Sequence, residues 1–186
     1  MKLKKYLYKK VESTNNVALR LIKQGNQRGI ILTDQQTKGK GQRKNKWISI
    51  KGNLFLSVFF EISKKISLSK IINLNLKIIK KIIYKKINTL ILIKKPNDIL
   101  INKKKVCGIL QETIFMQNRK YLIVGIGINV SSSPKINNYP TTFLNNHTNK
   151  KLNRLELFKE IKSLNIGLKP QKTKLSGHGG LLFNNA

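Results

Sequence analysis

Cysteine and long apolar runs are nearly absent from this chain of 186 residues. The single cysteine, Cys107, cannot form an internal disulfide, and His147 and His178 are isolated in polar surroundings, so no Cys/His zinc site is expected. No stretch reaches the roughly 18 to 20 consecutive apolar residues of a membrane-spanning helix. The basic residues 1–10 lack the apolar segment and cleavage site of a secretory signal. We therefore expect a soluble, cytoplasmic protein whose metal, if any, is held by oxygen ligands.

Acidic residues are also scarce, because seven Asp and Glu oppose 38 Lys and Arg, which gives a formal net charge of +31. Such an excess can indicate a nucleic-acid-binding surface, since neutralised phosphates release counterions. Nearly all of it is lysine, however, and lysine, isoleucine and asparagine, which are all abundant here, have AT-rich codons. The lysines are scattered and are not interleaved with aromatic residues. We attribute the charge to compositional bias and expect no specific nucleic-acid partner.

The length suits one domain with a hydrophobic core, and the order of the elements is mixed α and β. Apolar residues at helical spacing predict helices from the cap at Ser13–Asn15 to Gly25, from Ser67 or Ser69 through Ile87, and after a cap at Asn153. After a short strand-like start before Ser13, apolar runs predict strands over residues 29–33, 53–62, 90–93, 99–101, 105–115 and 121–130, with a break at 94–98 and turns at 102–104 and 118–119. Residues 165–186 have little periodicity and predict an irregular basic tail after a domain over residues 1–164.

A polar loop, QQTKGKGQRKNKW over residues 35–47, is expected to be exposed and flexible. Gly39 and Gly41 allow a close backbone approach and expose N–H donors, while Lys40 and Arg43 add positive charge. These features suit an anion-binding loop, although taken alone they also suit a solvated surface loop. The pattern GxxxxGK[ST] is absent and Gly125-x-Gly127 lacks a third glycine, which excludes P-loop and dinucleotide-binding motifs.

Several segments together resemble the catalytic domain of biotin protein ligases over roughly residues 6–162. The resemblance rests on Ser13-Thr14-Asn15, QQTKGKGQRKNKW (family form close to QTxGRGRxGRxW), KKPND (family KWPND), KVCGIL (family KxxGIL), GIGINV and YPTTFLN. It implies an α+β fold of the biotin/lipoate ligase, class II synthetase-like type, with a mixed, mainly antiparallel sheet flanked by helices. It also implies ATP-dependent formation of biotinyl-5'-AMP and transfer of biotin to a lysine of the biotin carboxyl carrier protein of acetyl-CoA carboxylase or a similar carrier. Mg²⁺ is expected with ATP, held largely by the phosphates.

The resemblance implies three catalytic residues. Lys105, the lysine of KxxGIL, is expected to direct positive charge at the phosphate that biotin's carboxylate attacks. Arg43, together with Lys40, is expected to hold phosphates, and Asp98 is expected to orient Lys105 or the incoming lysine. We expect Lys105 to be a surface lysine on a hairpin, where it contributes little to stability.

The resemblance also implies the binding residues. Ser13, Thr14 and Gln36 match positions that bind the ureido ring, although the first two also suit a plain helix cap, and Asn15 of the same motif is also expected to bind the ligand. Gly39 and Gly41 would let the loop close over the adenylate. The remaining positions are Trp47 as a wall of the ligand site or a core residue, Asn97 at the nucleotide, Gly108 at fixed spacing from Lys105, and Asn129 near the adenine.

This sequence departs from the family pattern at Lys95, where tryptophan is usual, at Gln42 and Asn45, where arginine is frequent, and at Lys44, where glycine is usual. We expect the loop to bind the adenylate less tightly as a result. The sequence shows no winged-helix domain and no small C-terminal β domain, so transcriptional repression is not expected. It leaves open whether the chain forms a homodimer.

Three alternatives remain open at this point. A lipoate ligase or octanoyl transferase shares the fold, but the RRxxGGG segment of lipoate ligases is missing. A basic nucleic-acid-binding protein would explain the charge but would leave PND, KVCGIL and GIGINV unexplained. A reduced, inactive homologue would explain the departure at Lys95 and the unusual tail.

Overall fold

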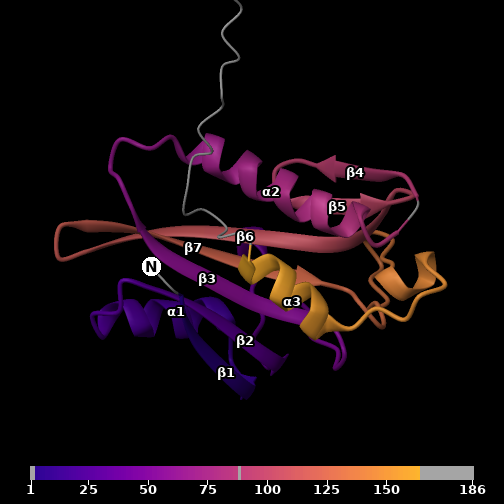
Figure 1. Ribbon diagram of the computed structural model, residues 1–186, viewed down its shortest axis with the longest axis horizontal. Coiled ribbons are helices and arrows are strands. Elements are labelled where there is room, and N and C mark those ends of the chain that lie inside the picture. The colour runs from indigo at the N-terminus through magenta and orange to yellow at the C-terminus, as the bar shows by residue number, and fades with distance from the viewer. Residues whose placement is uncertain (1–2, 88, 164–186) are drawn as a thin grey trace, which may run out of the picture.

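The computed structural model describes residues 3–87 and 89–163, which form a mixed, mainly antiparallel sheet flanked by helices, so the predicted fold class is confirmed (Figure 1). The elements are β1 (Lys4–Val11), α1 (Thr14–Lys23), β2 (Arg28–Gln36), β3 (Leu54–Ile62), α2 (Leu68–Tyr84), β4 (Ile91–Lys94), β5 (Asp98–Ile101), β6 (Lys104–Met116), β7 (Arg119–Ile128) and α3 (Arg154–Ser163), with short 3₁₀ turns at Gln42–Lys44 and Leu144–His147. The strand order is β1-β2-β3-β7-β6-β5-β4, in which β1 and β2 are parallel and the other described pairs antiparallel.

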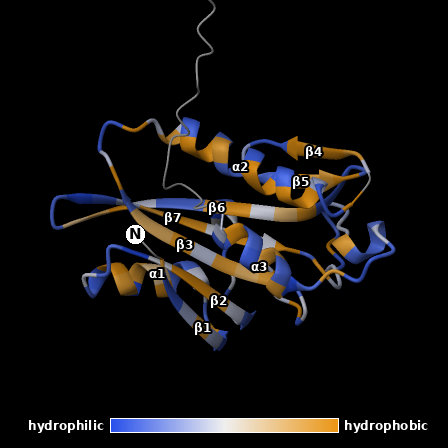
Figure 2. Cartoon of the chain, viewed as in Figure 1, coloured by the Kyte–Doolittle hydropathy of each residue, from blue (hydrophilic) through white to orange (hydrophobic). Residues whose placement is uncertain are grey.

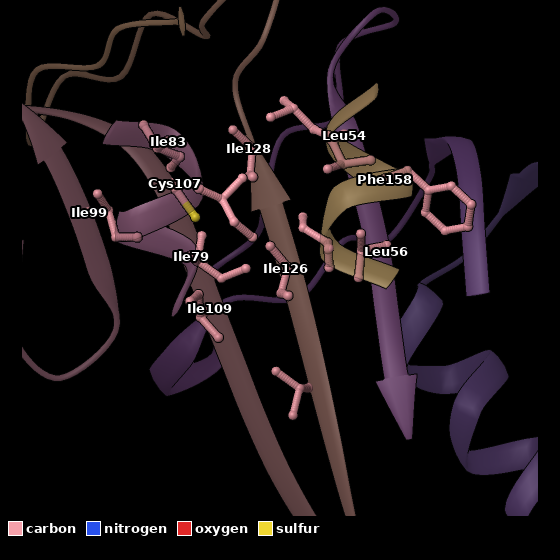
Figure 3. Close-up of a cluster of buried hydrophobic side chains, with 14 of the residues drawn as sticks. Leu54, Leu56, Ile79, Ile83, Ile99, Cys107, Ile109, Ile126, Ile128 and Phe158 are labelled. Carbon is pink, nitrogen blue, oxygen red and sulfur yellow. The ribbon is translucent and has the colours of Figure 1, made fainter. Parts of the chain in front are cut away.

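Two hydrophobic cores lie on opposite faces of this sheet. The larger contains α2, α3 and alternate residues of β3 and β7, and Figure 3 shows its centre at Leu54, Leu56, Ile79, Ile83, Ile99, Cys107, Ile109, Ile126, Ile128 and Phe158. The smaller packs α1 against Ile31, Phe59 and Ile123, so that α1 and α2 lie on opposite sides of the sheet (Figure 1). Because successive strand residues point to opposite faces, the central strands are apolar on both sides, and Figure 2 shows them largely orange.

The helices follow the predicted periodicity, with small differences at their ends. Val17, Ala18, Leu21 and Ile22 are buried as expected, and Gly25 adopts φ +84° just after the end of α1. The predicted end of the second helix at Ile87 is wrong, because α2 ends at Tyr84. The Asn153 cap is present, since its Oδ1 accepts a hydrogen bond of 2.8 Å from the Leu155 amide.

Two other predicted boundaries are also wrong. The second strand extends to Gln36, because its pairing with β1 continues as far as Val11↔Gln36, so the polar loop begins after residue 36. The turn between β6 and β7 consists of Gln117 and Asn118, which have φ 48° and 62°, and it lies one residue before the predicted turn. The tail predicted over residues 165–186 lies outside the described residues. Among the described helices, none is long and apolar enough to cross a membrane.

Candidate active site

Three glycines form a surface without side chains on the α1 face of the sheet, called the glycine floor below. Gly108 of β6 lies opposite Gly127 of β7, and Gly125 lies between Ser57 of β3 and Leu110 of β6. A Cβ atom on Gly127 would lie 2.5 Å from Trp47 Cε2, and one on Gly108 would lie 2.7 Å from Trp47 Cζ3, so the indole rests directly on the floor. A Cβ atom on Gly125 would overlap the side-chain amide of Asn15. The glycines of KVCGIL and GIGINV are therefore required by close packing.

Neutral polar groups gather where α1 begins, above Gly125. The amide and hydroxyl of Thr14 donate to Gln36 Oε1 at 2.8 and 3.1 Å, and Ser57 Oγ lies 2.7 Å from Thr14 Oγ1 and 2.5 Å from Asn15 Oδ1. Ser13 occupies the N-cap position, but its hydroxyl makes no capping hydrogen bond. Ser13, Thr14 and Asn15 are at most 4% exposed. This buried cluster of hydroxyls and amides suits a neutral polar ligand.

The loop over residues 37–46 folds back on itself at the edge of the floor. The amides of Thr37 and Lys38 donate to Val11 and Glu12, and the Trp47 amide donates to Gly39 at 2.9 Å. A Cβ atom on Gly39 would lie 2.5 Å from the Trp47 carbonyl oxygen, which explains the glycine there. Arg43, at the tip, has φ 52° in the left-handed region and an exposed side chain. The loop thus brings cationic side chains to the edge of the floor.

The Lys105 side chain is enclosed, and the prediction of a surface lysine is wrong. Its Nζ lies 2.9 Å from Asp98 Oδ1, and the two side chains are 15% and 20% exposed. The rings of Trp47 and Tyr139 lie 5.5 and 5.1 Å from Nζ, within the range of cation–π attraction. The segment containing Tyr139 is held in place by the Lys105 backbone, because the Lys105 amide donates to Pro140 and the Lys105 carbonyl accepts from Thr142, both at 2.9 Å. The expected pairing of Asp98 with Lys105 is present.

These groups line one cleft of about 420 Å³, a volume typical of small-molecule sites. The predicted residues that line it are Ser13, Thr14, Asn15, Gln36, Lys40, Gly41, Arg43, Trp47, Asn97, Asp98, Lys105 and Gly108. Two predicted residues lie outside this cleft. Gly39 lines a more open hollow formed by the same loop, and Asn129 lines a small adjoining hollow, where its Nδ2 donates to Thr142 O at 3.0 Å. The cleft also contains Lys46, Lys94 and Lys95, so its edge is strongly basic.

Sequence reasoning missed three residues of the site. Ser57 is a single polar residue within the buried strand LFLSVFF, and that isolation was the available signal. Glu112 is one of only seven acidic residues and accepts a hydrogen bond of 2.6 Å from Asn15 Nδ2. Tyr139 belongs to the YPTTFLN segment, but no role was predicted for it, because its contact with Lys105 depends on how the chain after β7 folds back. Cys107 lies under the floor, where burial raises the pKa of its thiol, so it is not a nucleophile.

We predict weak, sequence-independent binding to DNA or RNA. Exposed lysines also occur far from the basic edge of the cleft, among them Lys9 on β1 and Lys77 on α2, so the positive charge is spread over the surface. Affinity measured by fluorescence anisotropy should fall steeply between about 50 and 200 mM salt. A tight complex that survives the higher salt concentration would contradict the attribution of the charge to composition.

Residues 7–129 match the biotin/lipoate A/B protein ligase family. The bifunctional ligase/repressor BirA of Bacillus subtilis (strain 168) is 35% identical over 116 residues, which are 60% of this chain and 34% of that protein. The chloroplastic biotin–protein ligase 1 of Arabidopsis thaliana is 32% identical over 126 residues, 62% of this chain and 32% of that protein. The chain therefore spans about a third of the length of these curated relatives.

Solved structures share the same fold. The biotin protein ligase from Aquifex aeolicus in complex with biotin and ATP has a TM-score of 0.70 and 28% identity, covering 86% of this chain and 67% of that one. The biotin protein ligase from Leishmania major in complex with biotinyl-5-AMP has a TM-score of 0.69 at 24% identity, covering 85% of this chain and 71% of that one. At that identity the second likeness concerns the fold alone.

Proposed function

The chain belongs to the biotin/lipoate A/B protein ligase family, and on that premise we propose that it activates biotin with ATP and transfers the biotinyl group to a carrier lysine. One observation carries this proposal. A neutral polar cluster lies above Gly125, and the Trp47 indole lies above Gly108 and Gly127 with the Lys105 side chain beside Gly108. Lys105, Lys40 and Arg43 give that end of the same cleft a positive charge. Gly125 and Gly127 are two residues apart on one strand, about 7 Å. Biotin has a similar polarity, with a neutral ureido ring at one end and a carboxylate at the other.

The first step joins two anions. Biotin's carboxylate oxygen attacks the α-phosphorus of ATP, and the bond to the leaving pyrophosphate breaks. Fixed positive charge must stabilise the transition state, because both reactants are negative. Lys105 can supply such charge, since Asp98 and the rings of Trp47 and Tyr139 restrain its ammonium group. Lys40 and Arg43 extend the positive charge along the loop toward the remaining phosphates.

The second step needs an amine nucleophile. The neutral amine of the carrier lysine attacks the acyl carbon of biotinyl-5'-AMP, the bond to AMP breaks, and the nitrogen loses one proton to solvent as the amide forms. Asp98 is the one carboxylate among the described residues that line the cleft, so it can orient the approaching amine. We place this reaction in the cytoplasm, with a biotin carboxyl carrier protein as the acceptor.

ATP is expected to bring Mg²⁺ with it. No group of three or more His, Cys, Asp or Glu side chains that could hold a metal ion occurs in the described part of the chain. The phosphates would therefore supply most of the ligands, as is usual for Mg²⁺ bound with a nucleotide. When bound, the ion would neutralise part of the negative charge of the phosphates, in addition to the part neutralised by Lys105 and Arg43.

The choice between biotin and a lipoyl or octanoyl acid follows from the polar cluster. A ureido ring can exchange hydrogen bonds with Thr14, Gln36 and their neighbours, whereas an apolar chain would shield these polar groups from water without adding a hydrogen bond. Pyrophosphate release should therefore be measured with biotin, lipoate and octanoate at equal concentration. We expect kcat/KM for biotin to exceed that for either rival by at least about a hundredfold. A preference for lipoate or octanoate would contradict the proposal.

The loop over residues 37–46 is expected to be mobile in the free protein and ordered in the adenylate complex. Its cationic side chains repel one another until an anion neutralises them, and closure would keep water from the reactive anhydride. Limited trypsin digestion checks this, because the loop offers Lys38, Lys40, Arg43 and further cleavage sites. Cleavage within the loop should be fast in the free protein and suppressed by biotin with ATP. Equal cleavage in both states would count against a closing loop.

A further inference from the structure

Glu112 stands out among the seven acidic residues of this basic chain. Five of them, Glu12, Asp34, Glu61, Asp98 and Glu160, form the ion pairs of the described structure, each with a lysine or an arginine. Glu112 instead accepts a hydrogen bond from a neutral amide, Asn15 Nδ2, at 2.6 Å. In a chain with 38 basic residues, a carboxylate beside the glycine floor that is hydrogen-bonded to a neutral amide indicates a specific role for Glu112.

The register of the sheet places Glu112 beside the floor. Glu112 pairs with Ile123 on β7, while Leu110 pairs with Gly125 two residues further along. Side chains on opposed residues of an antiparallel pair point to the same face, so Glu112 points to the face on which Asn15 covers Gly125. The Asn15 amide lies directly on Gly125 and reaches Glu112 of β6 on one side and Ser57 of β3 on the other.

A carboxylate accepts hydrogen bonds and donates none, so Glu112 fixes the orientation of the Asn15 amide. The NH₂ group must face Glu112, and Oδ1 must then face Ser57 Oγ, 2.5 Å away. The Ser57 hydroxyl is therefore the donor, shared between Asn15 Oδ1 and Thr14 Oγ1 at 2.7 Å, and the Thr14 hydroxyl donates in turn to Gln36 Oε1. One negative charge thus sets the direction of hydrogen bonding across the neutral polar cluster.

We propose that Glu112 is a positioning residue for substrate recognition, which orders Asn15, Ser57 and Thr14 so that the cleft offers one fixed pattern of donors and acceptors to the ureido ring. This inference rests on the proposed function. Glu112 acts through Asn15 and does not touch the reacting atoms. Its loss should therefore weaken biotin binding and leave the chemistry of the bound substrates nearly unchanged.

The test uses the Glu112→Gln variant, which keeps the size of the side chain but can donate as well as accept, so that the Asn15 amide can turn over. We expect KM for biotin to rise about tenfold, while kcat and KM for ATP stay within about twofold. Glu61→Gln is the matched control, since it makes the same change at an exposed ion pair with Arg119, and its KM for biotin should be that of the wild type. Thermal unfolding of each variant separates a folding defect from a binding defect.

A double variant distinguishes orientation from packing. In Asn15→Asp with Glu112→Gln, the amide at residue 112 donates to a carboxylate at residue 15, and Ser57 again faces an acceptor oxygen. We expect the double variant to recover most of the biotin affinity lost in Glu112→Gln, and Asn15→Asp alone to bind worst, because two carboxylates then face each other. No recovery, or an unchanged KM for biotin in Glu112→Gln, would overturn the inference. Absence of biotin binding by the wild-type protein in calorimetry would instead overturn the proposed function.

Discussion

Replacing Lys105 with alanine is expected to abolish biotinyl-adenylate formation while the protein stays folded. The variant removes the enclosed ammonium group from the cleft, and removal of one such preorganised charge typically lowers a rate about 100- to 1,000-fold. Some stability should also be lost, about 1–3 kcal/mol, because Asp98 is left without its partner. Biotin-dependent release of pyrophosphate measures the first effect, and thermal unfolding measures the second.

Two further variants test whether the loss of activity is due to the positive charge at residue 105. Lys104→Ala removes the same charge from an exposed neighbour on β6 and should keep full activity. Lys105→Met keeps an unbranched side chain between the rings of Trp47 and Tyr139 and should be as inactive as alanine, since the charge is what is missing. Full activity of Lys105→Ala would contradict the role of this residue.

Replacing Arg43 with alanine is expected to lower the rate of adenylate formation by a comparable factor, about 100- to 1,000-fold, with almost no change in stability. The side chain is exposed at the tip of the loop, so its removal costs little packing. In the complex, however, its guanidinium would bind phosphate oxygens with two hydrogen bonds, which lysine cannot reproduce. Single-turnover measurements with saturating biotin and ATP isolate the chemical step.

Arg119→Ala is the matched control for Arg43→Ala. Arg119 lies at the start of β7, pairs with Glu61 and does not line the cleft. Its removal should therefore leave adenylate formation unchanged. A loss of less than about threefold in Arg43→Ala would contradict a catalytic role for this loop residue. A rise in KM for ATP with kcat unchanged would limit Arg43 to ground-state binding.

The local pattern of the sequence predicted most elements of this fold. Helix periodicity placed Val17, Ala18, Leu21 and Ile22 on the buried side of α1, and β-branched runs located most of the strands. The ends of elements were less predictable, because they depend on pairing with distant segments. Gln36, for example, belongs to β2 only because Val11 of β1 continues to pair with it.

The site was predictable where motifs in the chain coincide with the walls of the cleft, and unpredictable where the sheet brings distant residues together. Lys105 and Asp98 are seven residues apart on neighbouring strands, so their pairing could be expected. Ser57 and Glu112 are far apart in sequence and meet through Asn15 only because β3, β7 and β6 align in one register. Tyr139 reaches Lys105 through a chain segment without regular structure, which no periodicity reveals.

The structure explains why residues 125 and 127 of the GIGINV motif are glycines. In the sequence, Gly125-x-Gly127 first serves to exclude a dinucleotide-binding loop. In the structure, both glycines belong to a strand, where the Asn15 amide and the Trp47 indole leave no space for a Cβ atom. Glycine is therefore needed here for close approach and not for an unusual backbone conformation.

The most direct test of the central claim is to incubate the purified protein with biotin, ATP, Mg²⁺ and a biotin carrier domain, and to measure the intact mass of the carrier. We predict that the carrier gains one biotinyl group, that the gain requires both biotin and ATP, and that replacing the acceptor lysine of the carrier by arginine prevents it. Omission of the carrier should leave pyrophosphate release limited to about one equivalent per enzyme molecule, with slow further turnover. A folded protein that neither modifies the carrier nor releases pyrophosphate with biotin and ATP would contradict the account.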